Sequence, residues 1–120
     1  MPTLPPVHRA RGIGAYERER KGARERLYDH RWEIAAKAHL TSHPLCRYCE
    51  LEGRVGAAVL VDHLYPHRGD RAVFWRRDWW MSSCRACHSG MKQRLERLGS
   101  AAIDALARRL GVAEWGASEG

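Results

Sequence analysis

The clearest hydrophobic pattern in the chain has helical spacing and follows Asp29, an acceptable N-cap. Its members are Trp32, Ala35, Ala36, His39 and Leu40. The run Ser-His-Pro at 42–44 ends the pattern, so we expect a helix over residues 30–42. His30 and His39 are interpreted as surface or packing residues.

Two apolar runs of strand length follow further along the chain. Residues 57–61 (AAVLV) predict a strand that ends on Asp62-His63, and residues 79–81 (WWM) predict a second short strand. Between them, the Pro and Gly content of residues 65–70 predicts a loop. Phe74-Trp75 begins a further apolar patch.

Helical spacing returns near the C-terminus. Met91, Leu95 and Leu98 lie on one face of an expected helix over 86–98, which Gly99 stops. A last helix is expected over 101–110, with Ser100 as its N-cap. Its apolar stripe consists of Ile103, Leu106 and Leu110. Helices together with a strand pair predict an α+β fold.

The N-terminal region has a different pattern. Residues 1–14 are rich in Pro and Gly, and residues 15–27 alternate Arg with Glu and have almost no apolar stripe. Residues 15–27 therefore form either a short, solvated helix or a flexible arm. We divide the chain into a basic arm (1–27), a folded domain (28–98) and a C-terminal helix with its tail (99–120).

Charge adds the first indication of a partner. The formal net charge is +7 and the pI is about 9.7, which favours a polyanionic partner such as nucleic acid over a mere contribution to solubility. No apolar run approaches the ~18 residues of a membrane span, so no membrane partner is expected. Because the N-terminus also lacks the apolar core of a signal peptide, we expect a cytoplasmic protein.

Four cysteines form two Cys-x-x-Cys pairs, and in a reducing compartment such cysteines are more often metal ligands than disulfides. They are Cys46, Cys49, Cys84 and Cys87. Four thiolates from two such pairs suit a closed tetrahedral zinc site, which is structural because it leaves no position open for water. The alternatives are one redox-active pair or two disulfides.

Asp62, His63 and His88 are the candidate reactive residues. Asp62 and His63 are neighbours at a strand end, so their side chains leave on opposite faces, and His88 directly follows the last cysteine. If zinc brings His88 close to Asp62, the two form an incomplete metal site that is open to water and phosphate. A neutral His63 could then act as general base. A lone Asp-His at a strand end is usually structural, but four cysteines that frame Asp-His and end in Cys-His form a much more specific pattern.

The motif layout resembles the HNH endonucleases, above all the small phage-type branch often encoded beside DNA-packaging genes. The resemblance covers roughly residues 28–95 and rests on the pattern Cys-x-x-Cys, Val-Asp-His-Leu-x-Pro-His-Arg-Gly-Asp, Phe-Trp and Trp-x-Ser-x-Cys-x-x-Cys-His. It also includes Tyr28-Asp29-x-Arg31-Trp32 and His43-Pro44-Leu45-Cys46 upstream.

This resemblance implies a small ββα-metal core held by a Cys₄ zinc site and carrying flanking helices. It further implies that Asp62 and His88 hold a catalytic divalent ion, Mg²⁺ or Mn²⁺, while His63 activates water to cut DNA. Possible supporting residues near the site are His67, Arg68, Asp70, Asp78 and Trp79. Candidate contacts to the DNA backbone are Arg9, Arg11, Arg18, Arg24, Arg31, Arg68 and Lys92.

One position departs from the family pattern. Trp79 stands where the family has an Asn that orients the base histidine, and an indole donates one hydrogen bond but accepts none. Asp78 could compensate if the strand register shifted by one residue. We therefore predict a metal-dependent DNA endonuclease. The alternatives are a zinc-bound nucleic-acid-binding module without activity, or an accessory protein of a packaging or repair complex.

Overall fold

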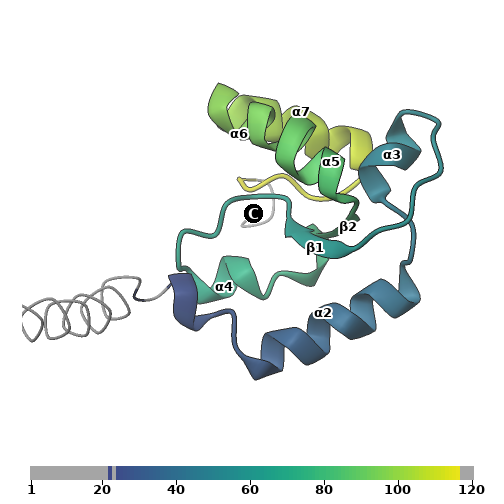
Figure 1. The fold of residues 1–120 in the computed structure, drawn as a ribbon. Helices are drawn as coiled ribbons and strands as arrows, with labels where there is room; N and C mark the ends of the chain where they lie inside the picture. The colour runs from purple at the N-terminus through teal and green to yellow at the C-terminus, as the bar shows by residue number, and fades with distance from the viewer. Residues whose placement is uncertain (1–21, 23, 117–120) are drawn as a thin grey trace, which may run out of the picture.

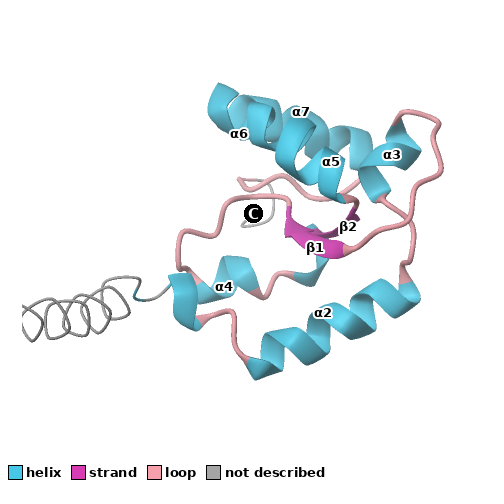
Figure 2. Ribbon diagram, viewed as in Figure 1, coloured by secondary structure: helices cyan, strands magenta, loops and turns pink. Residues whose placement is uncertain are grey.

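A two-stranded antiparallel sheet lies at the centre of the computed structural model, which describes residue 22 and residues 24–116. Strands β1 (Leu60–His63) and β2 (Trp80–Ser83) pair so that Asp62 is opposite Met81 and His63 is opposite Trp80. Helices α2 (His30–Ser42) and α4 (Arg71–Phe74) lie on one side of this sheet (Figures 1 and 2). The other side carries α3 (Arg47–Leu51), α5 (Arg85–Cys87), α6 (Gln93–Leu98) and α7 (Ser100–Leu110). The α+β prediction is confirmed. Most of the predicted N-terminal arm (1–21 and 23) and the end of the tail (117–120) lie outside the described residues.

Helix α2 (His30–Ser42) has the predicted bounds. The Asp29 side chain accepts a hydrogen bond from the Trp32 backbone N–H at 3.0 Å, which satisfies one of the free donors of the first turn. The helix directs Trp32 toward the sheet, where it packs with Leu27, Phe74 and Trp80 in a small buried cluster. This aromatic cluster, rather than the cysteine module, is what the helix covers.

The predicted strand bounds were only partly right. The run 57–61 was expected to be strand, but β1 begins at Leu60, because Ala57 forms an isolated bridge with Leu45 and does not join β2. Trp79 was expected to be strand, but it ends the 3-10 turn η1 (Arg77–Trp79) before β2 begins. The loop over 65–70 is confirmed and leads into a short helix, α4 (Arg71–Phe74), that the hydrophobic pattern did not predict.

The C-terminal helices contain an irregularity. The predicted helix 86–98 is a continuous helical path made of α5 (Arg85–Cys87), the π-helical turn η2 (His88–Lys92) and α6 (Gln93–Leu98). Leu98 is 75% exposed, so the expected apolar face is shorter than predicted. The last helix, α7, spans Ser100–Leu110, and Ser100 is its first residue rather than its N-cap, a position that Gly99 occupies. The predicted stripe of α7 is buried.

Two cores lie on opposite faces of the sheet. The larger core combines the cysteines and α3 (Arg47–Leu51) with Met81 and the apolar stripe of α7, and the smaller core is the aromatic cluster under α2. Because side chains alternate along a strand, Asp62 shares the face of Met81 and His63 shares the face of Trp80. No helix among the described residues is long and apolar enough to cross a membrane.

Candidate metal centres and reaction site

The four cysteines converge as the sequence predicts. Cys46 precedes α3 and Cys84 precedes α5, and each sulfur accepts a hydrogen bond at 3.4 Å from the backbone N–H of the cysteine three residues on. All four Sγ atoms lie within 4.8 Å of one another, and none of the four is in a disulfide. The cluster can therefore hold a metal ion, and the disulfide alternative does not describe this structure.

The sulfur geometry fits a tetrahedral ion. Cys49 Sγ lies 3.8 Å from Cys84 Sγ and 3.7 Å from Cys87 Sγ. Four thiolates at about 2.3 Å from one ion lie about 3.8 Å apart along each edge of the tetrahedron. Gly56 passes close to the cluster, and a Cβ there would lie 3.1 Å from Cys49 Sγ, so this position favours glycine.

The thiols differ in acidity before any metal binds. The backbone N–H of Cys87 lowers the pKa of Cys84 to about 7, because it stabilises the thiolate. Burial raises the pKa of Cys87, so this thiol would lose its proton only to a metal ion. Cys84 is consequently more acidic than Cys87.

Asp62 is buried on the same face of the sheet as the cysteines, and its two oxygens have different partners. Oδ2 accepts a hydrogen bond from the Tyr48 hydroxyl at 2.6 Å and lies 3.2 Å from the Lys92 ammonium. Oδ1 faces His88, whose Nδ1 is 3.2 Å away. Burial raises the pKa of Asp62, but His88, Lys92 and Tyr48 together outweigh it, so the pKa is lowered and the carboxyl group is ionised.

The structure brings His88 to Asp62, as the sequence prediction requires. Among the described residues, His88 Nδ1 is buried and has no hydrogen-bond partner, although Asp62 Oδ1 is 3.2 Å away. Two neighbouring ligands of an octahedral ion with bonds of about 2.1 Å lie about 3 Å apart. A metal ion shared by these two atoms would satisfy the orphaned nitrogen. Without it, the carboxylate of Asp62 raises the pKa of His88.

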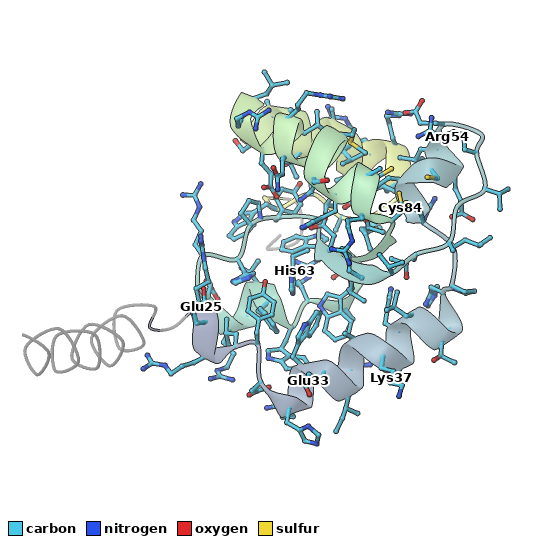
Figure 3. All side chains as sticks on the ribbon, viewed as in Figure 1. Glu25, Glu33, Lys37, Arg54, His63 and Cys84 are labelled. Carbon is cyan, nitrogen blue, oxygen red and sulfur yellow. The ribbon has the colours of Figure 1, made fainter. Side chains whose placement is uncertain are left out.

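His63 lies on the other face, between β1 and α2, while Cys84 lies on the side of α3 and α5 (Figure 3). The His63 ring stacks on the Trp32 ring with centroids 5.0 Å apart, and its centroid lies 4.5 Å from that of the Phe74 ring. Nε2 lies 3.2 Å from the Phe74 carbonyl oxygen, which can only accept, so this nitrogen carries the proton and Nδ1 keeps its lone pair. Burial and the neighbouring His67 lower the pKa of His63 to about 4, so the ring is neutral at pH 7.

His67 is the supporting residue that the structure places beside His63, with ring centroids 4.9 Å apart. Its Nδ1 accepts a hydrogen bond from the Gly69 backbone N–H at 3.1 Å. Nε2 therefore carries the proton in the neutral ring and donates to the Tyr28 hydroxyl, 2.8 Å away. Burial lowers the pKa of His67, which favours this neutral form. Tyr28 was not among the predicted site residues.

The other predicted supporting residues lie apart from His63. Arg68 is exposed with φ of 50°, and Asp70 caps α4 by accepting from the backbone N–H groups of Ala72 and Val73. With His67, these two residues line a hollow of about 660 Å³. A larger groove of about 1000 Å³ lies along α2 and β2, but its lining includes none of the three candidate reactive residues.

Asp78 and Trp79 do not face the base. Asp78 is exposed and pairs with Arg76. The Trp79 indole is 2% exposed, donates its N–H to the Ala113 carbonyl oxygen at 2.8 Å, and stacks on Trp115. The position expected to orient His63 thus belongs to the larger core, and the Phe74 carbonyl makes the orienting contact instead.

The candidate backbone-binding residues fall into three groups. Arg24, Arg31 and Arg68 are exposed, whereas Arg9, Arg11 and Arg18 lie outside the described residues. Lys92 is 1% exposed and bonds to the His63 carbonyl oxygen and to Glu96 as well as to Asp62. A surface contact with DNA is therefore not available to Lys92 in this structure, and its ammonium belongs to the reaction site.

Fold and site together define an HNH-like α+β domain with a cysteine cluster that can bind a metal. No family model and no curated protein matches the sequence. Among solved structures, the chain is similar to the HNH endonuclease of the deep-sea thermophilic bacteriophage GVE2, crystallised with a manganese ion. The two share 28% identity over 72% of this chain and 95% of that one, with a TM-score of 0.55. This match confirms the resemblance to the HNH endonuclease family.

Proposed function

We propose that the protein is a metal-dependent DNA endonuclease of the HNH type. The observation that carries this proposal is the approach of Asp62 Oδ1 to the orphaned His88 Nδ1, with His63 at the end of the same strand. The phage HNH endonuclease to which the chain is similar was crystallised with manganese, which supports a divalent ion here.

In this proposal, Asp62 and His88 would hold Mg²⁺ or Mn²⁺. Such an ion, when bound, would polarise the scissile phosphate and stabilise the leaving 3′ oxygen. His63 would take a proton from the attacking water through its free Nδ1. Its Nε2–H bond to the Phe74 carbonyl oxygen supports this role, because the contact fixes both the ring and its tautomer without an Asn at position 79.

The cysteine cluster would hold zinc and contribute to folding rather than to chemistry, since four thiolates leave no open position. Exposed arginines such as Arg24, Arg31 and Arg68 would bind the DNA backbone with little sequence readout. A role in a DNA-packaging or repair complex stays a prediction.

The test is nicking of supercoiled plasmid with Mg²⁺ or Mn²⁺. We expect wild-type protein to nick and His63→Ala to lose at least about a hundredfold in rate, which is the usual contribution of a general base. His30→Ala is a matched control, because His30 is an exposed histidine whose ion pair is with Glu33, away from the candidate site. Equal nicking by wild type and His63→Ala would remove His63 as the base. DNA binding without nicking in any metal would favour the inactive binding module.

A further inference from the structure

The candidate reaction site is linked to the cysteine cluster by one buried side chain. Tyr48 lies in α3, inside the loop between the ligands Cys46 and Cys49, and is fully buried. Its hydroxyl donates to Asp62 Oδ2 at 2.6 Å, although the two residues belong to different elements. The position of this hydroxyl therefore depends on the fold of the first cysteine loop.

Lys92 restrains the same oxygen from the other side. Its ammonium has three donors and lies within 3.2 Å of three oxygens: Asp62 Oδ2, the His63 carbonyl oxygen and Glu96 Oε2. With Tyr48 and Lys92 both on Oδ2, Oδ1 is left to face His88. The carboxylate is thus fixed in rotation and presents one oxygen to a metal ion.

His88 is fixed by the second cysteine loop. It directly follows Cys87, and its backbone N–H donates to the Cys84 carbonyl oxygen at 3.2 Å. Each of the two cysteine loops therefore positions one of the two candidate ligands, the first through the Tyr48 side chain and the second through the main chain. The relative position of the two loops therefore bears on the 3.2 Å approach of Asp62 to His88.

We propose that Tyr48 is a positioning residue through which the cysteine cluster sets the affinity of the Asp62–His88 site for a divalent ion. This inference rests on the proposed function, since it takes Asp62 and His88 as ligands. Tyr48 touches neither substrate nor metal, and it acts by holding Asp62 Oδ2 so that Oδ1 is free to coordinate.

The experiment measures Mn²⁺ binding to the zinc-loaded protein by electron paramagnetic resonance, without DNA. We expect Tyr48→Phe to keep its zinc and its cooperative unfolding, because the ring still fills the core, and to bind Mn²⁺ about tenfold more weakly, as loss of a hydrogen bond to a charged group implies. Tyr65→Phe is the matched control. Tyr65 is also buried and donates to a carboxylate, Asp104, so its variant should keep wild-type affinity.

The outcomes separate this inference from the proposed function. If Asp62→Ala binds Mn²⁺ as tightly as wild type, the ion does not use Asp62 and the proposed metal site is wrong. If Asp62→Ala loses binding but Tyr48→Phe keeps it, only the positioning role is overturned. A second measurement needs no variant: in protein with ¹³C-labelled tyrosines, Mg²⁺ should shift the Cζ signal of Tyr48 and leave that of Tyr65 in place. No shift at Tyr48 would overturn the inference even if Tyr48→Phe failed to fold.

Discussion

Replacing Trp79 with Asn restores the residue that the HNH pattern expects, and the structure predicts that this change harms the protein. The Trp79 indole is 2% exposed and lies 4.6 Å from the Tyr65 ring and 5.4 Å from the Trp115 ring. Its N–H is satisfied by the Ala113 carbonyl oxygen. An Asn at this position would place a polar amide in an apolar site and leave a cavity.

The magnitude follows from burial. A buried tryptophan removes about 150–250 Å² from water, and replacing such a side chain with a small one costs about 3–5 kcal/mol. For a domain of this size, each kcal/mol lowers the melting temperature by about 4–8 °C, so we expect Trp79→Asn to melt at least about 12 °C lower. Since the total stability of a small domain is about 5–15 kcal/mol, this loss removes a substantial share of it.

The assay is thermal unfolding of the zinc-loaded protein, followed by plasmid nicking under conditions where the variant is folded. Asp78→Asn is the matched control, because Asp78 is exposed and its pair with Arg76 contributes at most about 1 kcal/mol. It also tests whether an amide one residue earlier helps the base, and we expect unchanged nicking. A stable Trp79→Asn protein that nicks faster than wild type would refute this reasoning.

Three further predictions concern the metal and the buried charges. Cys84→Ser should lose both zinc and cooperative unfolding, and a folded, metal-free variant would contradict the structural role of the cluster. His63 should remain neutral in NMR titrations at pH 6, because its pKa in the folded protein is about 4, below the ordinary 6.5. The neutral ring therefore contributes its full stabilisation above pH 6.5, and the unfolding free energy falls by about 3 kcal/mol as the pH is lowered to 4. A His63 ring that protonates near pH 6.5 would disprove this burial. Lys92→Met should lower the unfolding free energy by about 3–5 kcal/mol, because it leaves Asp62 and Glu96 without their buried partner. Urea titration measures this change, and a value below about 1 kcal/mol would argue against the pairing.

Local signals in the sequence were enough to predict α2 and the cysteine cluster. The Asp29 cap and the Ser-His-Pro run set the bounds of α2, because capping and termination depend on neighbouring residues. The two Cys-x-x-Cys pairs predicted that the four cysteines meet, since one shared ion can bind four thiolates. The approach of His88 to Asp62 follows from that meeting and was predicted for the same reason.

Long-range contacts decided what the sequence could not predict. Residues 57–59 have strand-like composition, but Ala57 pairs with Leu45 instead of with β2. Lys92 suggested a surface cation by its charge, but it lies at the end of the π-helical turn η2 with its ammonium buried against Asp62 and Glu96. Tyr48 carried no signal except its place inside a cysteine loop.

The two faces of β1 explain why adjacent residues can do different chemistry in so small a protein. Asp62 lies on the face that the cysteine cluster supports, where hydroxyl and ammonium donors keep a carboxylate charged. His63 lies on the face that α2 covers, where packing against Trp32 and Phe74 keeps an imidazole neutral. A carboxylate must be ionised to bind a metal ion, and an imidazole must be neutral to accept a proton. A single strand provides both environments at neighbouring residues, because successive side chains point to opposite faces of the sheet. Two strands are therefore enough, since a different core packs against each face of the sheet.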